Sequence, residues 1–299
     1  MTAHALTIDL EDWHQLFHRR LTGEVVRPTK AVVGATHRLL DMLDEAGVRA
    51  TFFVLGNVAE AYPELVREVA RRGHELGSHT HSHDLIFRME PSAFRADVER
   101  SLAGLQDLTG QPVLGFRAPE FSVSHLRHWC FETLAELGFR YDSSVFPLPH
   151  ARYGIPEAPR RPFEIITPSG TIQEYPLATW DVGRSRLPVA GGSYFRLLPG
   201  RLLLRALGDI DEGGRTAVLY FHPYEFHRGW LNPSWPAWRR SLRASNLKFT
   251  LSRILLHNFR TNLIGQRLKP VLARFRFVPL GDIYHATHEI GEGSMHDRE

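Results

Sequence analysis

Three histidines at alternate positions form the part of this chain whose side chains are best suited to chemistry. They lie in the run His79-Thr80-His81-Ser82-His83. Two histidines four residues apart on a turn or a short helix point to the same side, so His79 and His83 can bind one common ligand. Imidazole nitrogens suit zinc and similar divalent metals. The spacing therefore predicts that His79 and His83 take part in a metal site.

An acidic cluster near the N-terminus could complete that site. The run Asp9-Leu10-Glu11-Asp12 follows the apolar, strand-like residues 5–8. One carboxylate and two histidines leave metal positions open for water and substrate. This combination indicates hydrolysis.

Alternating strand and helix patterns would position these residues. Further strands are predicted at 48–55, 113–116, 139–141, 164–166, 171–175, 217–221 and 275–280, and helices at 30–46, 63–72, 92–108 and 125–137. The repeated β-α order predicts an α/β fold with parallel strands and crossover helices. The polar clusters fall where predicted strands end, which is where chemistry collects in a barrel.

Composition sets broad limits on the class of protein. The 299 residues are 43% hydrophobic and 23% charged, as in soluble globular proteins. The single cysteine, Cys130, excludes an intrachain disulfide and a cysteine-rich zinc ribbon. We find neither a signal-peptide pattern near the N-terminus nor an apolar run of about 20 residues. These features lead us to expect a cytoplasmic protein.

The segment from Trp238 to Arg276 has a marked charge bias. It contains ten lysines and arginines and no aspartate or glutamate, and apolar residues alternate with the basic ones. Such a segment could lie on an anionic membrane surface. It could equally be a peripheral helix that packs on the body and exposes its arginines to solvent. We expect no nucleic-acid partner.

Six sequence pieces in a fixed order identify a family resemblance. The chain resembles the polysaccharide deacetylases of the NodB-homology type, carbohydrate esterase family 4, over about residues 5–225. It is most similar to the subgroup of peptidoglycan deacetylase-like and allantoinase-like members, and within it to a branch from exosortase-type exopolysaccharide loci. The pieces are the acidic run 9–12, Ala50-Thr51-Phe52-Phe53-Val54, the histidine segment 73–83, Phe116-Arg117-Ala118-Pro119, residues 138–144 and Tyr220-Phe221-His222-Pro223.

The resemblance implies a distorted parallel (β/α) barrel with fewer than eight strands. We expect a catalytic domain over residues 1–230. A basic, mainly helical extension packed on the barrel would follow over residues 231–290, and a disordered tail over residues 291–299.

The resemblance also assigns roles to the site residues. It implies one divalent metal ion, with zinc first and cobalt or nickel as alternatives, held by His79, His83 and an acidic residue. Asp9 would be the general base, His222 the general acid, and Arg117 would pair with the catalytic carboxylate.

The third metal ligand departs from the usual pair of adjacent aspartates. In an extended chain Asp9 and Glu11 point to one side and Asp12 to the other, which favours Glu11 as the ligand. A kink at the strand end, and the family's preference for aspartate, would favour Asp12. The sequence leaves both open.

Other residues are expected around the metal centre. Asp142 is expected to pair with His222 or Arg117, and Glu174 is a further supporting carboxylate. The remaining candidates for the surroundings of the site or for substrate contact are Pro119, Trp13, Tyr194 in the glycine-marked loop 191–196, and Leu219.

The expected reaction is removal of N-acetyl groups from an amino-sugar glycan or a lipid-linked precursor in exopolysaccharide biosynthesis. The partner would be an N-acetylated glycan or a polyprenyl-linked saccharide, with peripheral contact to the inner face of the cell membrane. Two alternatives remain open: an allantoinase-like amide hydrolase, and a non-catalytic glycan-binding protein on the same fold.

Overall fold

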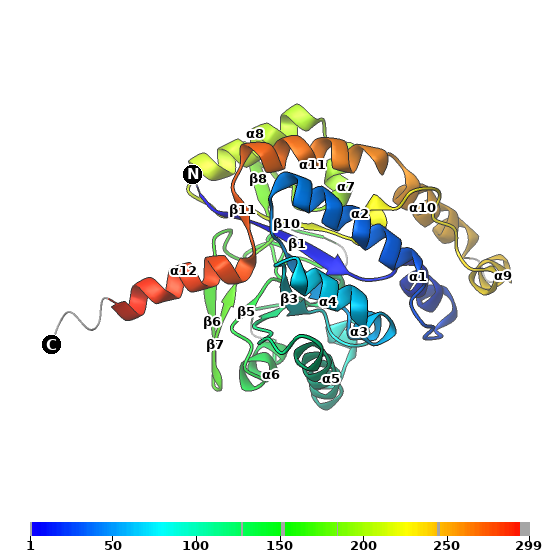
Figure 1. Cartoon of the computed structure of the whole chain (residues 1–299), viewed down its shortest axis with the longest axis horizontal. Coiled ribbons are helices and arrows are strands. Elements are labelled where there is room, and N and C mark those ends of the chain that lie inside the picture. Colours follow the sequence, from blue (N-terminus) through cyan, green and yellow to red (C-terminus); the bar gives the residue numbers. More distant parts are fainter. Residues whose placement is uncertain (1, 127, 151–152, 184, 244–245, 294–299) are drawn as a thin grey trace.

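A parallel sheet forms the centre of the molecule (Figure 1). The computed structural model describes residues 2–126, 128–150, 153–183, 185–243 and 246–293. Seven parallel strands follow the order β10-β1-β2-β3-β4-β5-β7, and β6 adds an antiparallel edge. Their bounds are β1 His4–Leu10, β2 Thr51–Val54, β3 Glu75–Ser78, β4 Gly115–Phe116, β5 Tyr141–Asp142, β6 Phe163–Thr167, β7 Gly170–Glu174 and β10 Val218–Phe221.

The sheet curves toward a barrel, but its two ends are not joined by a continuous row of strand hydrogen bonds. After β7, the chain runs alongside β10, where the Ala178 backbone N–H donates to the Val218 carbonyl over 3.1 Å. Further along, the Tyr220 N–H donates to the Ala190 carbonyl over 2.8 Å. These isolated bonds join the two ends of the sheet. The predicted distorted parallel barrel is confirmed.

Helices cover the outside of the sheet because each presents one apolar face to it. In α2, for example, Val32, Leu39 and Leu43 are buried, and the helix ends at Gly47, whose φ of 63° a glycine adopts without strain. The covering helices are α2 Ala31–Ala46, α3 Gly56–Ala61, α4 Pro63–Arg71, α5 Pro91–Thr109, α6 Cys130–Glu136, α7 Gly192–Leu197 and α8 Gly200–Glu212. A small hairpin, β8 Thr179–Val182 and β9 Ser185–Pro188, lies outside the main sheet.

The C-terminal extension divides into two structurally different parts. Helix α11 (Asn262–Arg274) packs against α2, α7 and α8, and strand β11 (Phe277–Val278) pairs with the start of β1. These elements belong to the barrel. Only two residues of the predicted strand 275–280 form β11, because helix α12 (Leu280–Gly293) begins directly after it.

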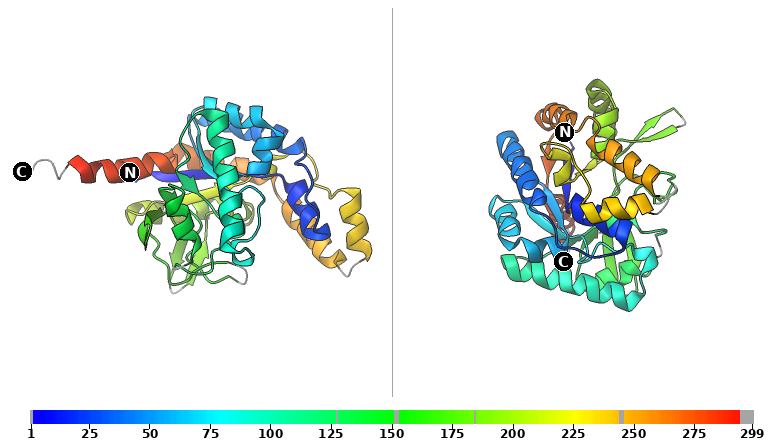
Figure 2. Two further views of the ribbon diagram at one scale, coloured as in Figure 1. Left: turned by 90° about the horizontal axis from the view of Figure 1, so that it is seen from below. Right: turned by 90° about the vertical axis from the view of Figure 1, so that its right-hand side faces the viewer.

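The other part of the extension projects from the body at the end opposite α12 (Figures 1 and 2). It consists of α9 (Trp235–Arg243) and α10 (Leu247–Asn258), which lie beside α1 (Trp13–Thr22). A separate apolar cluster joins these helices; its buried members are Trp13, Phe17, Leu21, Leu231 and Ala237.

The expected tail from residue 291 lies partly in a helix. Helix α12 continues through Gly293, and residues 294–299 lie outside the described residues. Among the described helices, none has both the length and the apolar composition needed to cross a membrane.

Candidate active site

A buried carboxylate and a buried arginine meet where β1 and β4 end. Asp9 is the last but one residue of β1, and Arg117 directly follows β4. The Arg117 guanidinium donates from Nη1 to Asp9 Oδ1 over 2.8 Å and to Thr7 Oγ1 over 2.7 Å. It also bonds twice to Ser143 and lies 4.3 Å from the centre of the Phe53 ring. These contacts fix the Asp9 carboxylate in one orientation, which is the pairing expected from the sequence.

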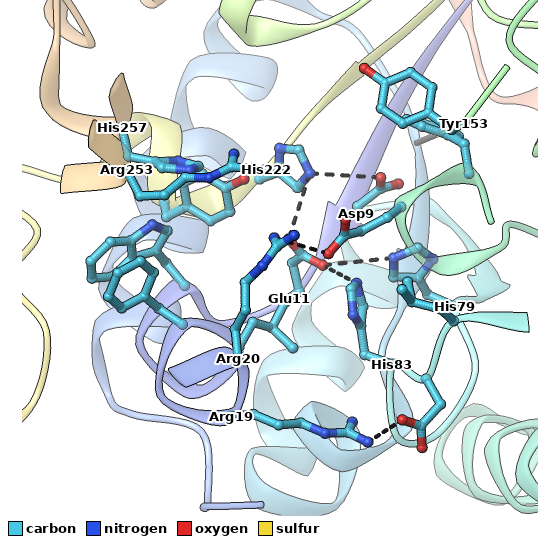
Figure 3. Close-up of a pocket in the computed structure, with 18 of the residues that line it drawn as sticks. Asp9, Glu11, Arg19, Arg20, His79, His83, Tyr153, His222, Arg253 and His257 are labelled. Atoms are coloured by element: carbon cyan, nitrogen blue, oxygen red, sulfur yellow. Dashed lines mark hydrogen bonds and ion pairs between the residues drawn. The ribbon is translucent and has the colours of Figure 1, made fainter. Parts of the chain in front are cut away.

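Glu11 and two histidines form a cluster that could hold a metal ion. Glu11 Oε2 lies 2.9 Å from His83 Nε2 and 3.7 Å from His79 Nε2 (Figure 3). One donor atom from each residue lies within 4.8 Å of the other two. All three side chains are nearly shielded from solvent, and imidazole with carboxylate is a donor set that zinc and related ions accept.

The second nitrogen of His79 supports this interpretation. His79 Nδ1 lies 2.8 Å from the Arg117 carbonyl oxygen, to which it donates when protonated. With Nδ1 held in this way, Nε2 faces the Glu11 carboxylate. Metal-binding histidines are commonly held through their other nitrogen in this way. The residues present therefore fit a divalent ion.

The two histidines converge through a loop rather than a helix. Residues 79–83 lie outside regular secondary structure, and Thr80 and His83 have positive φ angles of 66° and 61°. Left-handed backbone at such residues costs free energy and commonly occurs at functional sites. The short-helix alternative was therefore wrong, but the rings of His79 and His83 do meet as expected, with centroids 5.2 Å apart.

Asp12 does not join the histidines. Its carboxylate accepts hydrogen bonds from the backbone N–H of Gln15 and from both the N–H and the hydroxyl of Thr29. Asp12 is the N-cap of α1 and ties that helix to residue 29. The chain bends at Leu10, where the Glu11 N–H donates to the Asp9 carbonyl over 3.0 Å, and Asp9 and Glu11 both line the cavity. The alternative of Asp12 as a ligand therefore does not fit the structure.

His222 faces both acidic residues from the end of β10. Its Nε2 lies 3.6 Å from Glu11 Oε1 and 3.9 Å from Asp9 Oδ2. On the other side of the ring, Nδ1 lies 3.4 Å from Glu225 Oε2, and Tyr224 stacks on the ring at 4.7 Å. The Glu225 carboxylate is itself fixed, because it accepts the His222 backbone N–H over 3.0 Å.

The charges around His222 favour its protonated form. Burial lowers the pKa of His222, but Glu11, Glu225 and Asp9 outweigh that effect and raise it to about 9. For Glu11 the effects are reversed: burial raises the pKa of its carboxyl, but His83 and His222 bring that pKa well below its usual value. A divalent cation at Glu11 would compensate part of the negative charge and lower the pKa of His222 toward neutrality.

These residues line a cavity of about 500 Å³. Its walls combine the carboxyl ends of β1, β3, β4 and β10 with α1 and α10. Besides Asp9, Glu11, His79, His83 and His222, the lining consists of Trp13, Leu16, Phe17, Arg19, Arg20, Asp84, Leu85, Arg88, Glu120, Phe121, Tyr153, Ser193, Tyr220, Tyr224, Arg253 and His257. Trp13 thus lies where the sequence led us to expect it.

Three other predicted contact residues do not line this cavity. Leu219 is completely buried in the apolar core, because alternate residues of a strand point to opposite sides. Tyr220 and His222 take the inner side instead. Pro119 is buried and begins a short turn whose next two residues, Glu120 and Phe121, line the wall.

The glycine-marked loop is also placed differently from our expectation. Tyr194 is partly buried beside Tyr153 and does not line the cavity itself. A Cβ atom on Gly192 would lie 2.2 Å from Glu225 Oε1, and one on Gly191 would lie 2.6 Å from the Tyr220 ring. The two glycines therefore allow the backbone to pack tightly over Tyr220 and Glu225, on either side of His222 in the sequence.

Asp142 and Glu174 form a buried pair behind the site. Asp142 accepts the N–H and the hydroxyl of Ser144, and Glu174 accepts the N–H of Val145. Burial raises the pKa of both carboxyls, that of Glu174 more, and the two carboxyls share a hydrogen bond. The hydrogen bonds of Asp142 thus go to Ser144 and Glu174, and neither expected partner, His222 or Arg117, is among them. The Ser144 hydroxyl in turn accepts the Ala118 N–H, which supports the loop beside Arg117.

Sequence reasoning missed several residues of this site. Glu225 stands three residues after His222, a spacing that places it within one turn, and Tyr220 stands two residues before, on the same side of the strand. Those spacings could have identified both. The contribution of Arg253 and His257 could not have been found, because it depends on where α10 packs.

Comparison with known proteins assigns the class of domain. Residues 28–141 match the polysaccharide deacetylase family model, and residues 143–285 match a model described as a domain of unknown function (DUF3473). Residues 28–141 thus correspond to a polysaccharide deacetylase domain, and the second match follows almost directly after them. The site draws on both, because His79, His83 and Arg117 lie in the first match and His222 in the second.

Curated relatives agree with this assignment over part of their length. The peptidoglycan-N-acetylglucosamine deacetylase of Bacillus cereus is 34% identical over 84 residues, 28% of this chain and 30% of the relative. The chitooligosaccharide deacetylase of Sinorhizobium fredii is 38% identical over 92 residues, 31% and 39% of the two chains. The matches thus span about a third of each relative.

Solved structures share the fold over nearly the whole chain. A Mycobacterium smegmatis protein assigned to the polysaccharide deacetylases has a TM-score of 0.65 at 22% identity, covering 97% of this chain and 91% of that one. An allantoinase has a TM-score of 0.60 at 14% identity, covering 96% and 91%. At these identities the likeness concerns the fold alone.

Proposed function

We propose that this protein is a metal-dependent hydrolase that removes N-acetyl groups from an amino-sugar glycan. The observation that carries the proposal is the placement of Asp9 and His222 beside the cluster of Glu11, His79 and His83. The two curated relatives are named as deacetylases of peptidoglycan N-acetylglucosamine and of chitooligosaccharides, which supports the substrate class.

The proposed ion is zinc, with cobalt or nickel as alternatives, held by Glu11, His79 and His83. When bound, such an ion would acidify a water molecule and polarise the acetyl carbonyl. Asp9 would take the proton of the attacking water as general base. Arg117 orients Asp9 for this role, because the guanidinium binds Oδ1 of Asp9 and leaves its Oδ2 facing the cavity and His222.

His222 would complete the reaction as general acid. An amine leaves a tetrahedral centre only when its nitrogen is protonated, and the carboxylates of Asp9 and Glu225, which face the His222 ring, favour the imidazolium that would supply this proton. Glu225 and the stacked Tyr224 hold the ring, so Nε2 points toward the reacting group. Base and acid would thus act from different strands, β1 and β10, on the same bound acetamido group.

Acetate release from a panel of N-acetylated oligosaccharides tests this function. We expect release by the protein loaded with zinc, and loss of release in Asp9→Asn and His222→Asn variants that still bind the metal. An allantoinase-like hydrolase would instead open allantoin in the same preparation. Saturable binding of the oligosaccharides without any product would favour the glycan-binding alternative.

The charges of the cavity support an anionic substrate, such as the lipid-linked precursor. Four arginines and four carboxylates line the cavity, so their charges cancel. With neutral histidines, a bound divalent ion would therefore bring the net charge of the cavity to +2. Arg20 and Arg253 each lie 5.4 Å from the centre of the Phe249 ring, so α1 and α10 place both guanidinium groups at one wall. Arginine is well suited to bind phosphate oxygens.

An Arg253→Gln variant separates anionic from neutral substrates. We expect KM for an N-acetylated glycosyl diphosphate to rise about tenfold, with little change for a neutral chitooligosaccharide. Equal effects on both substrates would contradict the anionic preference. The role in exopolysaccharide synthesis and the cytoplasmic location stay predictions, to be tested by deletion of the gene and by cell fractionation.

A further inference from the structure

The helices α9 and α10 expose an apolar surface that the barrel does not cover. In α10, Leu247, Leu251 and Leu255 follow one another at intervals of four and are 39%, 43% and 60% exposed. Residues at this spacing share one helix face. The exposed apolar residues of the two helices and the residue after them are Trp235, Leu242, Leu247, Leu251, Leu255, Leu256 and Phe259.

The inner face of α10 is firmly attached to the rest of the protein. Ile254 is buried, and the Asn258 side chain bonds to both the N–H and the carbonyl of Leu231. The Leu256 carbonyl accepts a hydrogen bond from Arg196 over 2.6 Å. The leucine stripe therefore points outward because the opposite side of the helix is already in use.

Basic side chains surround this apolar surface. Arg239 lies between Trp235 and Leu242 on one face of α9, since the three stand at intervals of four and three residues. The exposed basic residues here are Arg239, Arg240, Lys248 and Arg260. The sequence has no acidic residue between positions 238 and 276, so nothing within that segment offsets their charge. Exposed leucine and tryptophan beside uncompensated lysine and arginine are typical of helices that lie in the interface of an anionic membrane.

The same helix also forms part of the cavity wall. Arg253 and His257 of α10 line the cavity, two residues on from Leu251 and Leu255 of the outer stripe (Figure 3). A ligand in the cavity is thus separated from the apolar surface by the width of one helix.

We propose that this α9–α10 surface, defined by the exposed apolar and basic residues above, binds the face of an anionic lipid bilayer. The leucines and tryptophan would enter the headgroup region, and the basic side chains would contact lipid phosphates. The cavity wall that α10 forms would then lie close to the membrane. This surface role goes beyond the deacetylase activity and does not depend on it.

Vesicle sedimentation of the full chain tests the proposal. We expect binding to vesicles of equal parts phosphatidylglycerol and phosphatidylcholine, little binding to pure phosphatidylcholine, and weakening by salt. In a Leu251→Glu/Leu255→Glu variant the affinity for the anionic vesicles should fall at least about tenfold. The matched control is Ile166→Glu/Val182→Glu, which changes two exposed apolar residues on β6 and β8 and should bind like the unchanged protein.

A second pair of variants isolates the charge. Arg239→Gln/Arg240→Gln/Lys248→Gln should bind at least about tenfold more weakly, whereas Arg201→Gln/Arg205→Gln/Arg274→Gln, which changes three arginines that line a second pocket on α8 and α11, should not. Unchanged thermal unfolding and unchanged turnover of a soluble substrate would show that each variant folds. Equal vesicle binding by both members of either pair would overturn the proposal. A lack of binding to anionic vesicles would also overturn the proposal. This holds if the protein is a monomer, and equally if it is a dimer that the leucine substitutions dissociate.

Discussion

Two glutamates at opposite ends of the sheet show how one residue type takes different roles. Glu75 begins β3, and its carboxylate accepts three hydrogen bonds, from the hydroxyls of Thr51 and Tyr141 and from the Gly281 N–H. Glu11 follows the end of β1, and its near neighbours are the imidazoles of His79, His83 and His222.

The pKa values of the two side chains move in opposite directions. Burial raises the pKa of Glu75, whereas the nearby histidines hold that of Glu11 well below its usual value. The amino end of the barrel is thus closed by groups that satisfy one another, with α12 supplying the last donor. The carboxyl end leaves charged groups facing a cavity, which is the arrangement a ligand can use.

The largest expected effect separates these two carboxylates. Glu11→Gln should lower zinc binding and acetate release by a factor of about a thousand or more, because the amide carries no charge and is a poor zinc ligand. The matched variant Glu75→Gln should keep zinc binding and acetate release. Its free energy of unfolding should fall by roughly 1 to 3 kcal/mol, since the amide cannot accept all three hydrogen bonds that the Glu75 carboxylate accepts. Metal analysis, acetate assays and denaturant unfolding measure these effects. Zinc bound normally by Glu11→Gln would break the comparison.

Arg117 should contribute to stability as well as to the site. Arg117→Ala would leave Asp9 buried without its charged partner, and we expect a loss of about 3 to 5 kcal/mol in the free energy of unfolding. A double variant Arg117→Met/Asp9→Asn should recover part of that loss but no activity. If the single variant were as stable as the unchanged protein, the pairing would have little energetic role.

The amino end should respond to acid through His74. This histidine packs on Phe52, and its Nδ1 accepts the Ala50 N–H, so burial lowers its pKa from 6.5 to about 4. The unfolded chain therefore binds a proton between these values and the folded protein does not, which makes the folded protein less stable as pH falls through this window.

The change in the free energy of unfolding should amount to roughly 1 to 2 kcal/mol, reduced from the full linkage value by solvent screening. In His74→Asn, which keeps an acceptor but does not titrate, the free energy of unfolding should depend less on pH over the same range. Denaturant unfolding at several pH values measures both slopes. Identical slopes would show that His74 is not the group responsible.

The smallest expected effect concerns Asp12. Asp12→Ala removes the cap of α1 and should cost about 1 kcal/mol of stability, while zinc content stays unchanged. Loss of zinc in this variant, with the helix intact by circular dichroism, would show that Asp12 and not Glu11 is the ligand.

Much of the fold follows from patterns that the chain shows locally. The predicted strands 48–55 and 217–221 contain β2 and β10, and the helices 30–46 and 63–72 match α2 and α4 within a residue. Apolar periodicity and terminal glycines predict these elements, because their conformation follows from the nearby residues in the sequence. The sequence patterns predicted neither α7 nor α8, which lie between the predicted strands 171–175 and 217–221.

The sequence by itself determined the chemistry available: two histidines, an acidic run, an arginine and a histidine at strand ends, in an order that indicates a deacetylase domain. Only the tertiary structure decided which members meet. It brought Glu11 and not Asp12 to the histidines, placed Tyr220 rather than Leu219 on the cavity wall, and added Glu225 and a helix from the distant C-terminal segment. Residue type is a local property, whereas the direction of a side chain depends on strand parity, left-handed loop residues and packing between segments far apart in the chain.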